Sequence, residues 1–146
     1  MTTGSAAGPQ LKDEDYEALA MFRHVLRRFL AFSESAAQEA GLTPQQHQAL
    51  LVIRGSPNHS ISVGELAEQL LVRHHSAVEL ADRLSHAELL RREADLADRR
   101  RVRLVLTPRA EGLLTELSAT HREELRRLRP MLVKLLASLD EQASGS

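Results

Sequence analysis

The residues best suited to chemistry in this 146-residue chain are arginines gathered beyond its midpoint. Five arginines and no acidic residue stand between positions 99 and 109. A guanidinium fork binds phosphate oxygens and base edges well. We therefore take Arg99, Arg100, Arg101 and Arg103 as candidates for contact with a polyanion. Asp98 precedes them, and we expect it to pair with a neighbouring arginine and so fix the shape of the loop.

A second polar group lies about one helix upstream of these arginines. Its members can all form hydrogen bonds: Arg73, His74, His75, Ser76, Glu79 and Arg83. Histidine can donate to a base edge or a phosphate, and glutamate can accept from the amino group of cytosine. Either group alone is more often a solvated surface. Their order along the chain favours binding to DNA.

The elements predicted around these residues have the order of a winged helix-turn-helix. Ser62 begins a helix, with Glu65 three residues later as the reciprocal cap. A turn at 71–73 leads to a second helix with alanine and leucine inward at 77, 80, 81 and 84. Short strands follow at 89–93 and 102–106, the second with period-two alternation. Such a fold places its second helix in the major groove, and Ser62 would contact the DNA backbone.

Long helices are expected on both sides of this module. The first is predicted over 13–38, and Thr43-Pro44 with Gln46 indicates a capped helix after it. Thr107-Pro108 starts another, which Pro130 should kink or end, with a sixth helix beyond. The predicted fold is mainly α with a small β-hairpin wing. Its single domain covers 11–140: a DNA-binding core at 41–107 and dimerisation helices at 11–40 and 108–140. Residues 1–10 and 141–146 are predicted to be disordered.

Composition excludes several other classes of protein. The formal net charge is −1, so any basic surface must be local, and there is no cysteine for disulfide, thiolate or cysteine–metal chemistry. The histidines lack metal-ligand spacing, and no catalytic motif or phosphate-binding glycine loop is present. We expect no metal, no cofactor and no enzymatic activity. The chain has no long apolar run and no secretory signal pattern, which predicts a cytoplasmic protein without membrane contact.

Several motifs in this order resemble the MarR (multiple-antibiotic-resistance regulator) family of winged helix-turn-helix regulators. They are Leu42-Thr43-Pro44, Leu66-Ala67, Asp82-Arg83-Leu84, and the wing segment from Asp95 to Thr107. The resemblance covers about residues 11–140. Glu88 and Leu96 depart from it, because the family usually has glycine and proline there. In the left-handed conformation that glycine adopts at a helix end, Glu88 would be strained.

The resemblance implies a homodimer that binds a pseudo-palindromic operator in double-stranded DNA. Apolar residues of the terminal helices are candidates for the dimer interface: Leu19, Leu117, Leu125, Leu128, Leu132 and Leu135. Family members are typically repressors released by a small phenolic or anionic effector. Five residues are candidates for such a pocket: Phe22, Arg23, Phe29, Phe32 and His47. For both sets the alternative is ordinary intramolecular core, and for the pocket set we prefer it.

The sequence leaves two readings of function open. The first is a dimeric transcriptional regulator, a repressor released by its ligand. The second is a winged-helix protein-interaction module that does not read DNA sequence. The second should tolerate loss of Arg99, Arg100 and Arg101, and its binding should depend little on salt.

Overall fold

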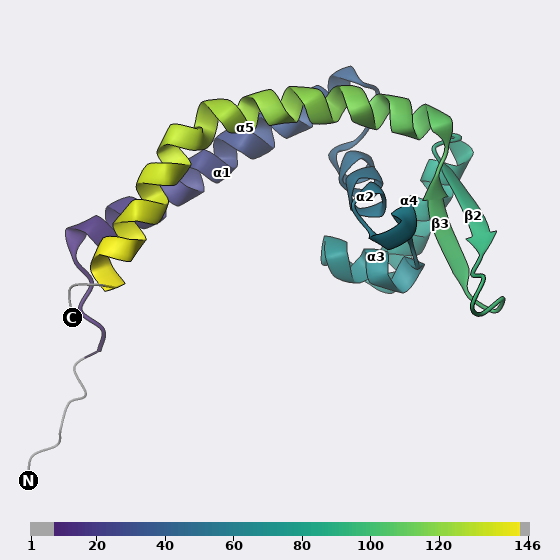
Figure 1. Ribbon diagram of the computed structural model, residues 1–146, viewed down its shortest axis with the longest axis horizontal. Coiled ribbons are helices and arrows are strands. Elements are labelled where there is room, and N and C mark those ends of the chain that lie inside the picture. Colours follow the sequence, from purple (N-terminus) through teal and green to yellow (C-terminus); the bar gives the residue numbers. More distant parts are fainter. Residues whose placement is uncertain (1–7, 144–146) are drawn as a thin grey trace, which may run out of the picture. The chain divides into compact units, whose positions relative to one another are not determined.

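The computed structural model describes residues 8–143, and Figure 1 shows its elements in chain order. These are α1 (Asp13–Glu39), α2 (Pro44–Arg54), a 3-10 turn η1 (Pro57–His59), β1 (Ser60–Ile61), α3 (Val63–Leu70), α4 (His74–His86), β2 (Leu90–Ala94), β3 (Val102–Leu106) and α5 (Pro108–Ala143). The disorder predicted for residues 1–7 and 144–146 lies outside the described residues. Residues 8–10 have no regular secondary structure, and α5 includes residues 141–143.

The chain divides into two compact units, which are described separately. The winged-helix core comprises residues 33–122. The terminal unit comprises the residues before 33 and those after 122. Since α1 and α5 run across these boundaries, each contributes one segment to each unit.

The capped helix starts predicted in the core are confirmed. Thr43 accepts from the Gln46 amide at 3.1 Å, and the Gln46 side chain accepts from the Thr43 amide at 3.0 Å. Ser62 and Glu65 form the same reciprocal pair at the start of α3. Each box satisfies backbone N–H groups that a helix start leaves without partners. These local bonds fix where α2 and α3 begin.

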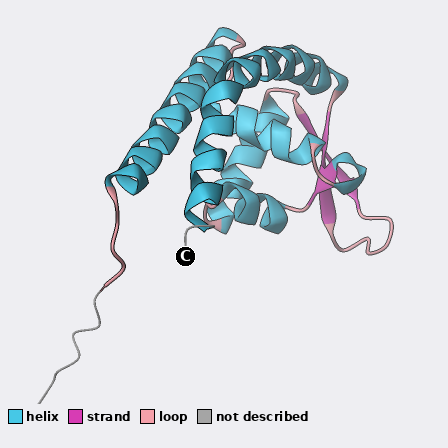
Figure 2. Cartoon of the chain, turned by 60° about the vertical axis from the view of Figure 1, so that its left-hand side comes forward, coloured by secondary structure: helices cyan, strands magenta, loops and turns pink. Residues whose placement is uncertain are grey.

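The predicted hairpin is confirmed, but it belongs to a three-stranded antiparallel sheet of order β1-β3-β2. Leu90 pairs with Leu106 and Ala94 with Val102, so β2 and β3 are in register over their whole length. Strand β1, which the sequence did not predict, adds Ser60 opposite Val105. It has only two residues, too few for a period-two pattern to appear. Figure 2 shows the strands in magenta and the β2–β3 loop extending past their ends.

The centre of the core is formed by leucines from α2, α3, α4 and β3. Leu50, Leu66, Leu84 and Leu104 have no exposed surface, and all four belong to one buried cluster. The inward face predicted for α4 is confirmed, because the alanines and leucines at 77, 80, 81 and 84 are all buried. The opposite face of α4 is thereby left to solvent.

Helix α5 corrects the prediction of a break at Pro130 and a separate sixth helix. It is one helix from Pro108 to Ala143 with Pro130 inside it. Proline removes one backbone hydrogen bond, but packing on both sides can outweigh that loss. Leu128 and Leu135 stand seven residues apart on one face of α5, and both are buried in the terminal unit. The buried face therefore continues past the proline, and the helix continues with it.

Helix α4 ends in the conformation expected to strain Glu88. Glu88 has φ of 59°, the Glu88 amide donates to Ser85 O, and the Leu89 amide donates to Leu84 O. This is the Schellman pattern that normally uses glycine at the left-handed position. The helix therefore ends as the resemblance implies, and a glutamate occupies the strained position.

Candidate nucleic-acid interface

The exposed face of α4 carries the predicted recognition residues. Arg73 lies at the N-cap of α4 without a side-chain capping bond, and His74 and His75 form the first turn. Arg73, His74, His75, Glu79 and Arg83 are exposed, while Ser76 is half-buried. Arg83 and Glu79 also line a shallow groove with Gln46 of α2. The side chains of this face are therefore placed to contact a large ligand.

The loop between β2 and β3 is held by its own aspartates. Asp95 Oδ1 accepts from the Ala97 amide at 2.9 Å, and Asp98 Oδ1 accepts from the Arg100 amide at 3.1 Å. Asp98 also lies 3.9 Å from the Arg101 guanidinium, which confirms its predicted pairing with a neighbouring arginine. The loop is thus ordered before it meets any ligand.

Two arginines at the tip of this loop are free of internal partners. Within residues 8–143, no carboxylate pairs with the guanidinium of Arg99 or Arg100, and both residues are exposed. Each guanidinium retains its full positive charge in a chain whose net charge is close to zero. The tip is therefore the part of the wing best suited to bind phosphate.

Arg103, predicted as a wing contact, is anchored within the core. Its guanidinium donates to Ser60 Oγ at 3.2 Å and to Ser60 O at 3.0 Å, and lies 3.7 Å from Glu65. The side chain is only 24% exposed. Arg103 ties β3 to β1 and to the start of α3, so it positions these elements beside each other. Ser62, the predicted backbone contact, caps the same helix and is half-buried.

Sequence reasoning missed Arg92, which links the wing to α4. Arg92 on β2 donates to Asp82 Oδ1 at 2.5 Å and to Ser85 Oγ at 3.1 Å, both on α4. These two acceptors stand three residues apart on one face of the helix. In the sequence, this contact is indicated by the three-residue spacing of Asp82 and Ser85 and by the basic pair Arg91-Arg92 that follows them. The contact holds the outer strand of the wing against the helix that carries the recognition residues.

The six dimer candidates separate into three groups by burial. Leu117 is buried in the core, and Leu128 and Leu135 are buried in the terminal unit. Leu132 is half-buried. Leu19, with 58% of its surface exposed, and Leu125 have large exposed apolar side chains. Only the last two are fully available to a second chain.

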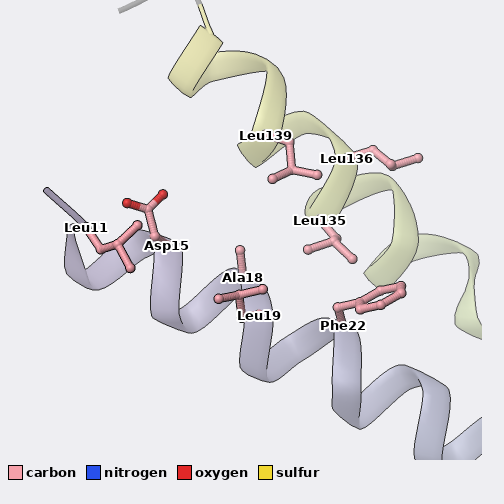
Figure 3. A pocket seen from close by; sticks show the side chains of 8 residues that line it. All are labelled: Leu11, Asp15, Ala18, Leu19, Phe22, Leu135, Leu136 and Leu139. Atoms are coloured by element: carbon pink, nitrogen blue, oxygen red, sulfur yellow. The ribbon is translucent and has the colours of Figure 1, made fainter. Parts of the chain in front are cut away.

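One of the five pocket candidates lines the apolar groove of the terminal unit. Phe22 lines an apolar groove of about 410 Å³ in the terminal unit, beside Leu19 of α1 and Leu135 and Leu139 of α5 (Figure 3). Arg23, Phe29, Phe32 and His47 are not among the residues that line it. Arg23 is exposed, Phe29 and Phe32 are half-buried in the terminal unit, and His47 is buried in the core.

The described residues contain neither a candidate metal site nor a helix suited to a membrane. No group of three or more histidines or acidic residues between positions 8 and 143 is placed to hold a metal ion. Among the helices of that same region, none has a long enough apolar stretch to cross a bilayer.

Comparison with known proteins extends the sequence resemblance. Residues 40–101 match the model of the MarR family. A helix-turn-helix-type transcriptional regulator of Bacillus subtilis, YsmB, is 35% identical over 66 residues, which are 45% of each chain. The present chain thus matches about half the length of that relative. The resemblance to the MarR family is thus confirmed over residues 40–101.

Solved structures share the fold over most of the chain. The MarR-family transcriptional regulator Sco3205 from Streptomyces coelicolor, solved in complex with DNA, has a TM-score of 0.67 at 20% identity. The alignment covers 93% of this chain and 89% of Sco3205. BpsR from Bordetella bronchiseptica, whose DNA binding is regulated by 6-hydroxynicotinic acid, has a TM-score of 0.62 at 21% identity, with 95% and 100% covered. At such identities the likeness shows the fold alone.

Proposed function

We propose that this chain is a sequence-specific DNA-binding transcriptional regulator. The observation that carries the proposal is the pairing of an exposed polar face on α4 with the unpartnered guanidiniums of Arg99 and Arg100 in one core. In this proposal α4 enters the major groove and the wing tip lies against flanking phosphates or the minor groove. The DNA complex of Sco3205 supports this use of the fold.

The proposed regulator acts as a homodimer through its terminal unit. Large apolar side chains are exposed there on both helical segments and just before α1: Leu11, Tyr16, Leu19, Phe22, Leu26, Leu30, Leu125, Val133, Leu136 and Leu139. So dense a set of exposed apolar residues marks an interaction surface. A second copy is the occupant, and a two-fold axis then sets two recognition helices about one DNA turn, roughly 10 bp, apart. The operator is accordingly a pseudo-palindrome.

The regulator is further proposed to be a repressor that a small phenolic or anionic effector releases. This part rests on the family resemblance, and the regulation of BpsR by 6-hydroxynicotinic acid supports it. Release requires only that the effector favour a dimer whose recognition helices no longer match the half-site spacing. A coupling of about 1–3 kcal/mol, or roughly 5–150-fold in affinity, is typical.

The decisive experiment is selection of genomic fragments by the purified protein, followed by titration of the best fragment at several salt concentrations. Regulator function predicts an enriched pseudo-palindrome bound with a steep salt slope. The slope should be about 0.9 for each phosphate contact. A winged-helix protein-interaction module would enrich no sequence and show a shallow slope. Arg91→Ala, which removes a basic residue of β2 already paired with Glu93, is the matched control for variants of the wing tip.

A further inference from the structure

His47 is a buried polar residue that the proposed DNA interface does not use. It lies on α2 in the winged-helix core with 3% of its surface exposed. Among the described residues, its Nδ1 is the one buried side-chain nitrogen or oxygen without a hydrogen-bond partner. Buried polar atoms are nearly always paired because an unpaired one costs stability. A polar residue that is buried at such a cost in stability is a candidate for a functional role.

The neighbour of His47 is a second histidine with a different environment. The ring of His121 on α5 lies 4.8 Å from that of His47, centroid to centroid. Its Nδ1 is 2.6 Å from Leu117 O and its Nε2 is 2.8 Å from Ser33 Oγ on α1. A carbonyl only accepts, so Nδ1 carries the proton. A serine hydroxyl can donate to a neutral ring and accept from a charged one. Both hydrogen bonds of His121 therefore survive protonation.

The buried residues of the core around α2 are mostly apolar. The elements that pack on α2 from the side of α3, α4, β1 and β3 present apolar residues to the core: Ile61, Leu66, Leu80, Ala81, Leu84 and Leu104. On α1, Glu34 follows Ser33 but is exposed. On α5, Glu124 follows His121 by three residues, and its carboxylate lies 3.9 Å from the guanidinium of Arg127. A proton on His47 would thus meet an apolar core and the ring of His121.

These surroundings set the direction of the response to pH. Burial, and then repulsion by His121, lowers the pKa of His47 below its ordinary 6.5. The unfolded chain, whose histidine has the ordinary pKa, therefore binds the proton more readily than the folded chain. The stability that depends on neutral His47 is complete above pH 6.5. It is lost progressively as the pH falls from 6.5 toward the lowered pKa of the folded state.

We propose that His47 and His121 form a proton-operated switch where α1, α2 and α5 meet in the core. Protonation displaces the His47 ring from its apolar packing and shifts α2. Because α2 packs against α3 and α4, the shift is transmitted to the helix-turn-helix. The consequence for DNA rests on the proposed function: acidification weakens operator binding through this pair.

The test compares the full-length wild type with His47→Gln, which cannot titrate, and with His24→Gln as control. His24 is an exposed histidine of the terminal unit. Thermal unfolding is followed from about pH 8 to about pH 5. The wild type should lose several degrees more of Tm than His47→Gln below about pH 6.5, since a destabilisation of this kind moves Tm by a few degrees. His24→Gln should follow the wild type.

DNA affinity is measured over the same range as the ratio of wild type to His47→Gln. The ratio cancels every effect of pH on DNA binding that the two proteins share. Relative to His47→Gln, wild-type affinity should fall about 5-fold or more between about pH 7.5 and pH 5.5, the usual lower range of allosteric coupling. A constant ratio would overturn the switch.

Nuclear magnetic resonance of the wild type keeps the proposal testable if His47→Gln does not fold. The pKa of the His47 imidazole should lie below its ordinary 6.5, and amide signals across α2 and α4 should move with the same midpoint. A His47 pKa at or above 6.5, or no movement in α4, would also overturn the switch. If the protein binds no DNA at any pH, the proposed function is refuted. The unfolding and resonance data would still show whether protonation of His47 shifts α2 and α4.

Discussion

The winged-helix core encloses a large cluster of leucines, whereas the terminal unit leaves most of its leucines exposed. In the core, Leu50, Leu66, Leu84 and Leu104 are wholly enclosed by other residues of the same chain. In the terminal unit, Leu19 and Leu139 expose more than half of their surface and line an apolar groove. The core therefore completes its hydrophobic packing internally. The terminal unit leaves much of its packing to be completed by something else, for which we propose a second copy.

The two regions also differ in how polar groups are satisfied. Helices α2 and α3 begin with complete capping boxes, and Arg92 and Arg103 cross-link the elements of the core. The exposed polar groups at the core surface, on α4 and at the wing tip, are those proposed to bind DNA. Exposure thus has a different meaning in each region. In the terminal unit the exposed apolar residues mark the proposed partner surface, whereas on α4 and at the wing tip the exposed polar residues mark the proposed DNA surface.

Truncation of a core leucine should give the largest effect. Leu84→Ala removes a fully buried side chain and should cost about 2–5 kcal/mol of unfolding free energy, measured by chemical denaturation. Leu51→Ala, on the exposed side of α2 in the same core, should change stability by less than about 0.5 kcal/mol. If the two variants lost equal stability, Leu84 would not be more deeply buried than Leu51, which would contradict the packing of the core.

A charge in the terminal unit should break the proposed dimer. Leu19→Glu places a carboxylate on the apolar surface and should raise the dimer dissociation constant at least tenfold, or about 1.4 kcal/mol. Sedimentation velocity over a range of concentrations measures it. Leu51→Glu adds the same charge to an exposed leucine of the core and should leave the assembly unchanged. A Leu19→Glu protein that sediments as the wild type does would contradict the proposed partner surface.

Within the core, variants of α4 should change base preference, whereas variants of the wing tip should change binding to all DNA sequences. His75→Ala and Ser76→Ala on α4 should each cost roughly 1–3 kcal/mol of operator affinity and relax preference at one base pair. Binding to a panel of single-substitution operators measures both effects. A uniform weakening over all operators would instead place these side chains on the DNA backbone.

Arg100→Ala at the wing tip should weaken binding to every DNA sequence. The salt slope should fall by about one unit for each phosphate that the variant no longer neutralises. The slope comes from titrations at several salt concentrations, and Arg91→Ala should leave it unchanged. If the Arg100→Ala slope equals that of the wild type, the tip does not bind phosphate.

Relief of backbone strain should give the smallest effect and the opposite sign. Glu88→Gly removes the side chain from a residue with φ of 59° and should add about 1 kcal/mol of stability without changing operator affinity. Ala87→Gly, one residue earlier at φ of −79°, should instead lower stability by about 0.5–1 kcal/mol. Thermal unfolding of the two variants tests the sign, and destabilisation by Glu88→Gly would show that Glu88 is not strained.

Local signals account for what sequence reasoning predicted well. The capping residues at 43 and 62, the inward face of α4 and the pairing of Asp98 all depend on residues within one or two helical turns. Strand β1 and the contacts of Arg92 and Arg103 were missed because their partners lie 7 to 45 residues away. The break at Pro130 was wrong because a local rule about proline was outweighed by packing along α5.

The sequence by itself determined the order of the helices and strands, their caps and the positions of the basic residues. Only the tertiary structure decided which leucines are enclosed and which are exposed, since helical periodicity gives both groups the same spacing. It also decided that Arg103 contacts Ser60 and Glu65, whereas Arg99 and Arg100 pair with no carboxylate within residues 8–143. The tertiary structure likewise placed the buried His47 against His121. Burial and electrostatics depend on what surrounds a side chain, and those surroundings come from segments distant in the sequence.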